Sequence, residues 1–150
     1  MATKAIQPET MSEKLISRWE RLGNKVVDLA EVLPETLFEY RPVEGVRTTA
    51  EVLRHVAFWN VHVADRASGR KGEETANELP KENFSSKKQI VDALKQSAAD
   101  ALSALKRHKA DISPEAAEML VTFIEHNCEH YGQLVVYARL NGIMPPASRG

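Results

Sequence analysis

Cysteine is almost absent from this sequence, since Cys128 is the only one among the 150 residues. An internal disulfide is therefore excluded, and a lone thiol fits a reducing compartment. The sequence also lacks any apolar run close to the ~18 residues that a membrane-spanning helix needs. Residues 1–10 are polar and contain no apolar signal-peptide segment. We therefore expect a cytoplasmic protein with no membrane partner.

An excess of charge of one sign is lacking too, because 20 basic and 21 acidic residues leave a formal net charge of −1. Lys and Arg form no basic run, so we expect no nucleic-acid partner. Apolar residues make up 43% and charged residues 27% of the chain, a balance that favours a packed core over disorder. The length is that of one domain. We expect a single domain over residues 1–150, with its core at about residues 10–146.

Four segments carry the signals of a helix start. In three, a Ser or Thr precedes a Glu or Gln by three residues, which is the spacing of a capping box. The fourth is a Ser followed by Pro, a residue favoured at the first helical position. The pairs are Thr10 and Glu13, Thr48 and Glu51, Ser86 and Gln89, and Ser113 and Pro114.

Each start leads into apolar residues spaced three and four apart, which form one stripe along a helix. The first helix should end at Pro34, the second should cover about residues 49–68, and the fourth should end at Gly142. No segment shows the two-residue period of a strand, so we predict an all-α four-helix bundle. The four stripes are Leu15, Trp19, Leu22, Val26, Leu29 and Leu33; Val52, Val56, Trp59 and Val63; Ile90, Leu94, Ala98, Ala101 and Leu105; and Met119, Phe123, Leu134 and Tyr137.

The join between the second and third helices, residues 69–85, is long and polar. A connection of this length allows the third helix to run parallel to the second, as in bundles with a crossover. The residues alone leave an antiparallel arrangement open as well.

Three histidines fall on the inner stripes. His126 and His130 are four apart and share one face of the fourth helix, with Cβ atoms roughly 5–6 Å apart. His55 lies on the stripe of the second helix. Neutral imidazole is a common ligand for zinc and also suits nickel, copper and iron. Three such ligands from two helices leave a coordination position open for water or substrate, as catalytic sites do.

The alternative is a structural role, since one histidine on an inner stripe is more often a hydrogen-bonded core residue. Three buried imidazoles without partners would cost ~1–3 kcal/mol for each unsatisfied group, and an ion would remove that cost. His62 lies seven residues after His55, roughly 10 Å further along the helix, and should not share its ion. His108 lies at the polar end of the third helix, where it can interact favourably with the helix dipole.

Other residues near His126 and His130 are weaker candidates for a functional role. Cys128 lies about 200° round the helix from each flanking histidine, so we expect an inert, partly buried thiol that points away. Glu125 and Glu129 are off the histidine face and should be exposed to solvent. Gln133 follows His130 by three residues and is either a donor behind the site or a surface residue. No residue is assigned to acid–base catalysis.

Two segments carry a resemblance to a known family: Tyr40-Arg-Pro-Val-Glu-Gly-Val-Arg-Thr-Thr-Ala-Glu-Val-Leu-Arg-His55-Val-Ala, and His126-Asn-Cys-Glu-His130-Tyr-Gly-Gln133-Leu followed by Arg139-Leu-Asn-Gly142-Ile-Met-Pro-Pro146. The sequence resembles the DinB-like proteins, which include the YfiT-type metal-dependent hydrolases and bacterial thiol transferases. With the helix layout, the resemblance covers about residues 10–146.

The resemblance implies an up-down-down-up bundle and one divalent ion on His55, His126 and His130. Nickel or zinc is expected, with iron or manganese as further candidates. It also implies a homodimer, for which Phe58, Val61 and Val136 are apolar residues off the predicted stripes.

Family members of assigned activity join a small thiol to an electrophile or rearrange such adducts. A metal-dependent thiol S-transferase is therefore the first hypothesis. A metal-dependent hydrolase and a non-catalytic, stress-linked metal-binding module are the alternatives.

Overall fold

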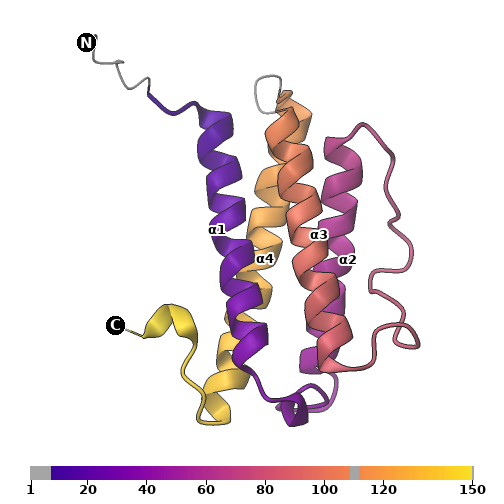
Figure 1. Ribbon diagram of the computed structural model, residues 1–150, viewed down its shortest axis with the longest axis vertical. Coiled ribbons are helices and arrows are strands. Elements are labelled where there is room, and N and C mark those ends of the chain that lie inside the picture. Colours follow the sequence, from indigo (N-terminus) through magenta and orange to yellow (C-terminus); the bar gives the residue numbers. More distant parts are fainter. Residues whose placement is uncertain (1–7, 109–111, 150) are drawn as a thin grey trace.

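A computed structural model describes residues 8–108 and 112–149, and these residues form six helical segments and no strand. The predicted all-α bundle is confirmed (Figure 1). None of the described helices is long and apolar enough to cross a membrane. The four long helices are α1 (Met11–Val32), α2 (Thr49–Ala67), α3 (Lys87–Arg107) and α4 (Pro114–Leu140), and the two short 3-10 helices are η1 (Glu35–Leu37) and η3 (Pro146–Ser148).

All four predicted helix starts are confirmed, and each N-cap side chain accepts a hydrogen bond from a backbone N–H of the first turn. At α2, the Glu51 N–H donates to the Thr48 hydroxyl at 3.2 Å, and the Thr48 N–H donates to the Glu51 carboxylate at 2.7 Å. The same reciprocal pairs occur at α1 and α3. Each cap contributes roughly 0.5–2 kcal/mol, so the helix boundaries follow from local sequence.

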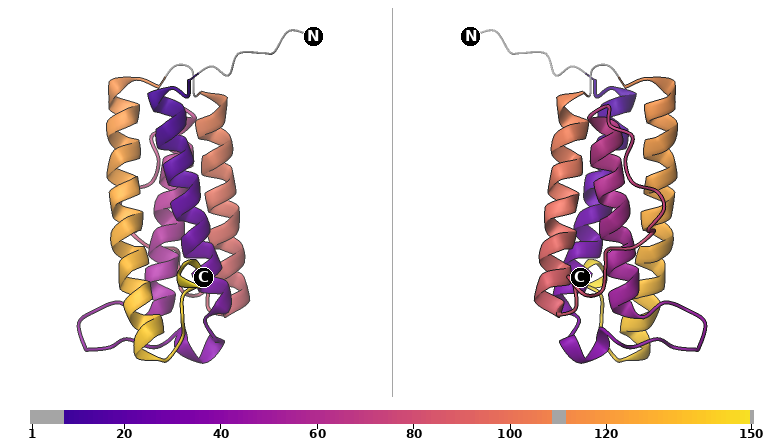
Figure 2. Two further views of the ribbon diagram at one scale, coloured as in Figure 1. Left: turned by 90° about the vertical axis from the view of Figure 1, so that its left-hand side faces the viewer. Right: turned by 90° about the vertical axis from the view of Figure 1, so that its right-hand side faces the viewer.

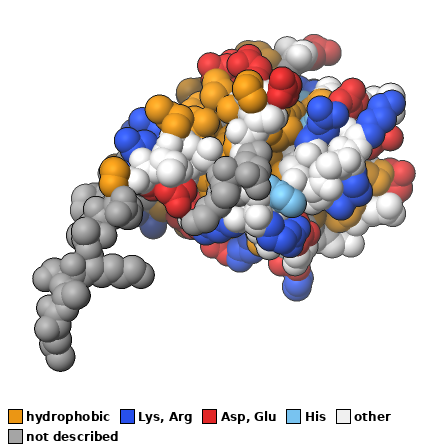
Figure 3. Space-filling view, turned by 90° about the horizontal axis from the view of Figure 1, so that it is seen from above, with side chains coloured by type: hydrophobic (Ala, Val, Ile, Leu, Met, Phe, Trp, Pro, Cys, Tyr) orange, Lys and Arg blue, Asp and Glu red, His pale blue; other side chains and the backbone are white. Residues whose placement is uncertain are grey.

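The helices have the up-down-down-up arrangement that the resemblance implied. In Figure 1, α1 and α4 run from the upper end of the bundle to the lower end, whereas α2 and α3 both run upward. Residues 68–86 make this possible, because they descend along the outside of α2 and return the chain to the lower end (Figure 2). The long join is therefore a crossover, and α2 and α3 pack in parallel. From the upper end, basic and acidic side chains are interspersed (Figure 3), consistent with the balanced charge.

Buried hydrogen bonds hold the crossover against α2. The Arg54 side chain is 2% exposed, and its Nε donates to the Glu78 carboxylate at 2.7 Å. Its Nη1 donates to the Phe84 carbonyl at 3.3 Å, and the Leu79 N–H donates to the Arg54 carbonyl at 3.4 Å. A buried guanidinium is tolerated only when it is paired and hydrogen-bonded, so this arginine fixes the descending segment to the helix.

Most residues of the predicted stripes form the core, but six side chains differ in burial from the expectation. Leu15, Trp59, Ala98, Met119 and Phe123 are only partly buried, towards the edges of the helix contacts.

Phe58, which we expected on the surface, is buried and meets the ring of Trp59 edge to face at 5.2 Å. The reason is that α2 is enclosed by α3, α4 and the crossover. More than one face of this helix is therefore buried.

The crossover packs closely against His62 of α2 at Gly72. Gly72 has φ +75°, and a Cβ there would lie 2.7 Å from His62 Nδ1. Gly69 has nearly the same conformation, φ +76°, but open space around it. Gly69→Ala should cost about 1–2 kcal/mol from the left-handed backbone alone. Gly72→Ala should cost roughly 1–3 kcal/mol more because of the clash. Urea unfolding of both variants measures the difference, and equal losses would contradict the packing described.

Candidate metal centre

The structure brings the three inner histidines together. His55 comes from the lower half of α2, and His126 and His130 lie one turn apart on α4. One ring nitrogen from each lies within 4.8 Å of the others, and Nε2 of His55 is 2.9 Å from Nε2 of His126. His55 is 6% exposed and the other two are partly buried. The predicted histidine triad is therefore a compact cluster between two helices.

The crossover orients the ring of His55. Its Nδ1 is 2.6 Å from the backbone carbonyl of Asn77. A carbonyl can only accept, so the proton of the neutral ring is on Nδ1 and the lone pair on Nε2. Asn77 also accepts from the Trp59 indole N–H through its side-chain oxygen, at 2.9 Å. Its φ of 60° is in the left-handed region, which asparagine adopts more readily than most residues.

A directed chain of hydrogen bonds orients His130. The Arg47 carbonyl accepts from the Tyr137 hydroxyl at 2.8 Å, and the Tyr137 oxygen in turn accepts from Nε2 of Gln133 at 2.8 Å. The other end of the Gln133 amide, Oε1, accepts from His130 Nδ1 at 3.0 Å. The Arg47 carbonyl can only accept, and this determines which group donates at each step of the chain. His130 therefore carries its proton on Nδ1 and its lone pair on Nε2.

His126 has a polar neighbour on one side and aromatic rings on the other. Its Nδ1 lies 3.2 Å from Oδ1 of the buried Asn127. The rings of Trp59 and Phe123 lie 6.3 and 5.8 Å from its ring. A neutral imidazole has a single N–H. When His126 donates it to Asn127, two lone pairs face each other across the 2.9 Å between His126 and His55. A cation between them removes that repulsion.

All three imidazoles are neutral at physiological pH. Burial lowers the pKa of His55 and of His126 to about 4, and it also lowers the pKa of His130. The nearby charges of Arg47 and of the other histidines also lower the pKa values in this cluster, whereas the carboxylate of Glu129 opposes them at His126 and His130. Neutral imidazole is the form that binds a metal, so these rings would not have to lose a proton before accepting an ion.

The cluster fits one divalent ion. Nitrogens that are each ~2.0–2.1 Å from one ion lie about 3 Å apart, close to the observed Nε2–Nε2 distance. Each Nδ1 has an oxygen acceptor, as the outer contacts of metal-binding histidines usually provide. No carboxylate or thiolate among the described residues joins the cluster. Three protein ligands leave at least one coordination position open.

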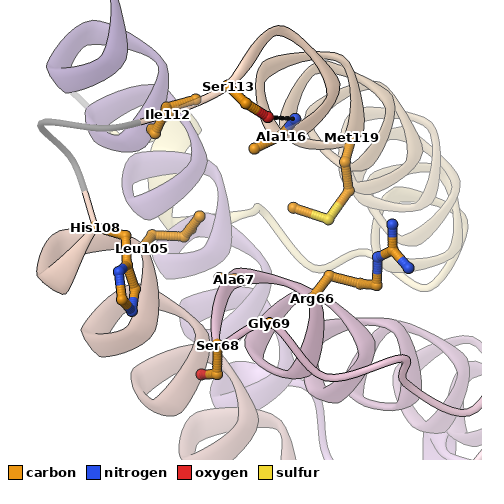
Figure 4. Close-up of a pocket in the computed structure, with 10 residues that line it drawn as sticks. All are labelled: Arg66, Ala67, Ser68, Gly69, Leu105, His108, Ile112, Ser113, Ala116 and Met119. Carbon is orange, nitrogen blue, oxygen red and sulfur yellow. Dashed lines mark hydrogen bonds between the residues drawn. The ribbon is translucent and has the colours of Figure 1, made fainter.

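The other histidines lie outside the cluster. His62 is 6% exposed, and its Nδ1 lies 3.2 Å from the Glu73 carbonyl, which makes it a structural contact to the crossover. His108 is the C-cap of α3, as its place at the helix end suggested. It lines a separate cavity of about 320 Å³ at the upper end of the bundle, together with Arg66 and Met119 (Figure 4).

The residues beside the histidine pair divide into surface and supporting positions. Glu125 and Glu129 are exposed, as expected. Cys128 is also exposed, so the expectation of a partly buried thiol was wrong, although it does point away from the cluster. The reason is that none of the described helices covers this face of α4. Gln133 lies behind the site, and its side-chain oxygen accepts a hydrogen bond from His130, whereas we had expected either a donor there or a surface residue.

Comparison with known proteins gives one family. The sequence model of the DinB superfamily matches residues 18–134, a range that contains His55, His126 and His130. A search of curated proteins gives no match.

The hydrogen-bond chain behind His130 makes Tyr137→Phe informative. The change removes the hydroxyl that orients Gln133, so divalent-metal affinity should fall by about 10–100-fold, as is typical for such outer contacts. Titration with zinc or nickel measures it. Tyr131→Phe is the matched control, because the Tyr131 hydroxyl makes no hydrogen bond within the described residues, and its affinity should stay unchanged. Similar affinities for both variants would show that the chain does not orient a ligand.

Proposed function

The chain belongs to the DinB superfamily, and we propose that His55, His126 and His130 hold one divalent ion at which a small thiol is prepared for transfer to an electrophile. The convergence of three neutral ring nitrogens, with no fourth protein ligand among the described residues, carries this proposal. A site meant only to stabilise the fold would be expected to close its coordination with protein ligands.

The donor set favours nickel or zinc. Imidazole suits both of these ions and iron, whereas manganese prefers oxygen ligands, which the cluster lacks. Such an ion stabilises the thiolate form of a thiol that coordinates it.

The residues of the chain supply three further contributions. Neutral imidazoles leave the positive charge of a bound divalent ion uncompensated. An anionic sulfur is therefore favoured over a neutral ligand at the open position. Asn77 and Gln133 hold the ring nitrogens in place, which lowers the cost of organising the site when substrate arrives. The rings of Trp59 and Phe123, 5.4 Å apart, provide an apolar wall beside His126 that limits water.

Hydrolysis is the alternative chemistry, with water in the place of the thiol. A hydrolase usually needs a general base near that water. Glu125 and Glu129 are exposed, and neither makes a hydrogen bond to the cluster. This observation supports the proposal of thiol transfer over hydrolysis, because a coordinated thiol loses its proton without a protein base. A non-catalytic metal-binding module is the third possibility.

The metal content of histidine variants tests the ligand set. The double variant His126→Ala with His130→Ala should contain no stoichiometric metal by elemental analysis, because one nitrogen does not retain the ion. His62→Ala is the control, since His62 is as buried as His55 but its ring contacts the crossover. It should keep its metal. Undiminished metal in the double variant, or loss of metal in the control, would refute the assignment.

Spectroscopy tests the chemistry. With cobalt or nickel in the site, addition of a small thiol should produce a sulfur-to-metal charge-transfer band, because the open position accepts sulfur. The band should be absent in His55→Ala, which lacks one ligand. A silent spectrum with several thiols, in protein shown to contain metal, would leave the hydrolase or the non-catalytic module as the better explanation.

We also place the protein in the cytoplasm, where the exposed Cys128 would stay reduced, and we propose that it forms a homodimer. Val61 and Val136 remain available for this contact, at 43% and 53% exposure, whereas the burial of Phe58 removes it. Leu140 is 61% exposed one turn after Val136, so α4 offers an apolar pair to a second copy. Light scattering at micromolar concentration should give twice the monomer mass, and Val136→Glu should reduce it. A monomeric mass in the unmodified protein would count against the dimer.

A further inference from the structure

Arg47 is fixed beside the histidine cluster through its main chain. It immediately precedes Thr48, the N-cap of α2, and its carbonyl accepts from the Tyr137 hydroxyl at 2.8 Å. Tyr137 contacts Gln133, which in turn contacts His130. The backbone of Arg47 is thus tied to α4 at the same hydrogen-bond chain that orients one of the three rings.

The side chain of Arg47 carries an unpaired charge. Its guanidinium makes no hydrogen bond or ion pair within the described residues, whereas Arg54 pairs with Glu78. The charge of Arg47 lies close enough to His55 and His130 to contribute to lowering the pKa of both rings. A guanidinium in this place repels a divalent ion in the cluster. An anionic group between the two would turn that repulsion into attraction on both sides.

The two sides of the cluster differ in character. The charge of Arg47 acts on His55 and His130, and His126 faces the rings of Phe123 and Trp59. The exposed Glu129 carboxylate acts on His126 and His130 in the opposite sense to Arg47. A ligand at the open position therefore lies among rings of which His55 has a guanidinium and, among the described residues, no carboxylate near it. Such a site suits a small molecule with one negatively charged end.

We propose that Arg47 binds the carboxylate of the substrate whose other end occupies the open position at the histidine cluster. The identification of that other end as sulfur rests on the proposed function, and the substrate class is then a small thiol that carries a carboxylate. The planar guanidinium matches a carboxylate with two parallel hydrogen bonds. Arg47 is the described residue that combines an unpaired guanidinium with proximity to these rings.

The experiment compares two ligands of the same shape, 3-mercaptopropionate and its neutral amide, 3-mercaptopropionamide. Both are titrated into the cobalt-loaded protein at saturating cobalt, and the sulfur-to-cobalt band gives each dissociation constant. The acid should bind about tenfold more tightly than the amide, or better, as expected for hydrogen bonds to a charged group. In Arg47→Gln the ratio of the two constants should fall by about tenfold, and Arg47→Lys should retain part of it.

Arg66→Gln is the matched control. Arg66 is on α2, and its guanidinium has no hydrogen bond or ion pair within residues 8–108 and 112–149. It lies eleven residues after His55 and lines the cavity at the upper end of the bundle (Figure 4). Its removal changes the net charge by the same amount and should leave the ratio unchanged. Because the amide carries the same sulfur, a direct effect of Arg47 on sulfur binding cancels in the ratio. Chelation of cobalt by the carboxylate itself would persist in Arg47→Gln.

The outcomes separate this inference from the thiol proposal. A band with both thiols but an equal ratio in wild type and Arg47→Gln, or an equal fall in Arg66→Gln, overturns the role of Arg47 and leaves thiol binding intact. If neither thiol gives a band, the thiol proposal fails, and glycolate and glycolamide are compared through the cobalt d–d bands. A preference for glycolate that depends on Arg47 supports carboxylate binding without sulfur, and equal binding overturns it.

Discussion

Burial of three imidazole rings between α2 and α4 imposes the constraint on which the arrangement of this bundle depends. Each ring has to remain uncharged, and each needs an acceptor for its one N–H. Asn77, Asn127 and Gln133 supply these acceptors from the crossover and from α4 itself. The lone pairs of His55 and His130 are thereby directed inward, so the same contacts that make burial tolerable also prepare the ring nitrogens for an ion.

The crossover has a second role beyond joining two parallel helices. Arg54 and His55 are adjacent on α2, and their side chains contact adjacent residues of the crossover, Glu78 and Asn77. The buried guanidinium therefore secures the segment at the point where it contacts the histidine cluster. This coupling explains why a long polar connection, which would ordinarily be exposed and variable, packs closely along a helix here.

Local sequence predicted the parts of this structure that depend on neighbours in the chain. Helix starts follow from caps such as Thr48 with Glu51, and the grouping of His126 with His130 follows from their spacing on one helix face. The rest depends on contacts between segments distant in sequence. The role of Asn77 and the burial of Phe58 require knowledge that the crossover lies against α2, and no local pattern contains that information. The spacing of Gln133 left open whether it lies behind the site or on the surface, and the direction of its hydrogen bond is set by the Arg47 carbonyl.

The chain from His130 through Gln133 and Tyr137 to the Arg47 carbonyl also limits where protons can go. Proton relay needs each member to accept a proton on one side while it releases another. An amide does this only by changing to a high-energy imidic acid, and a backbone carbonyl has no proton to pass on. The chain behind His130 is therefore insulated against proton transfer. A proton released by a ligand beside His130 has to be taken up by another acceptor, such as solvent, so the rate of any reaction there should respond to small buffer bases.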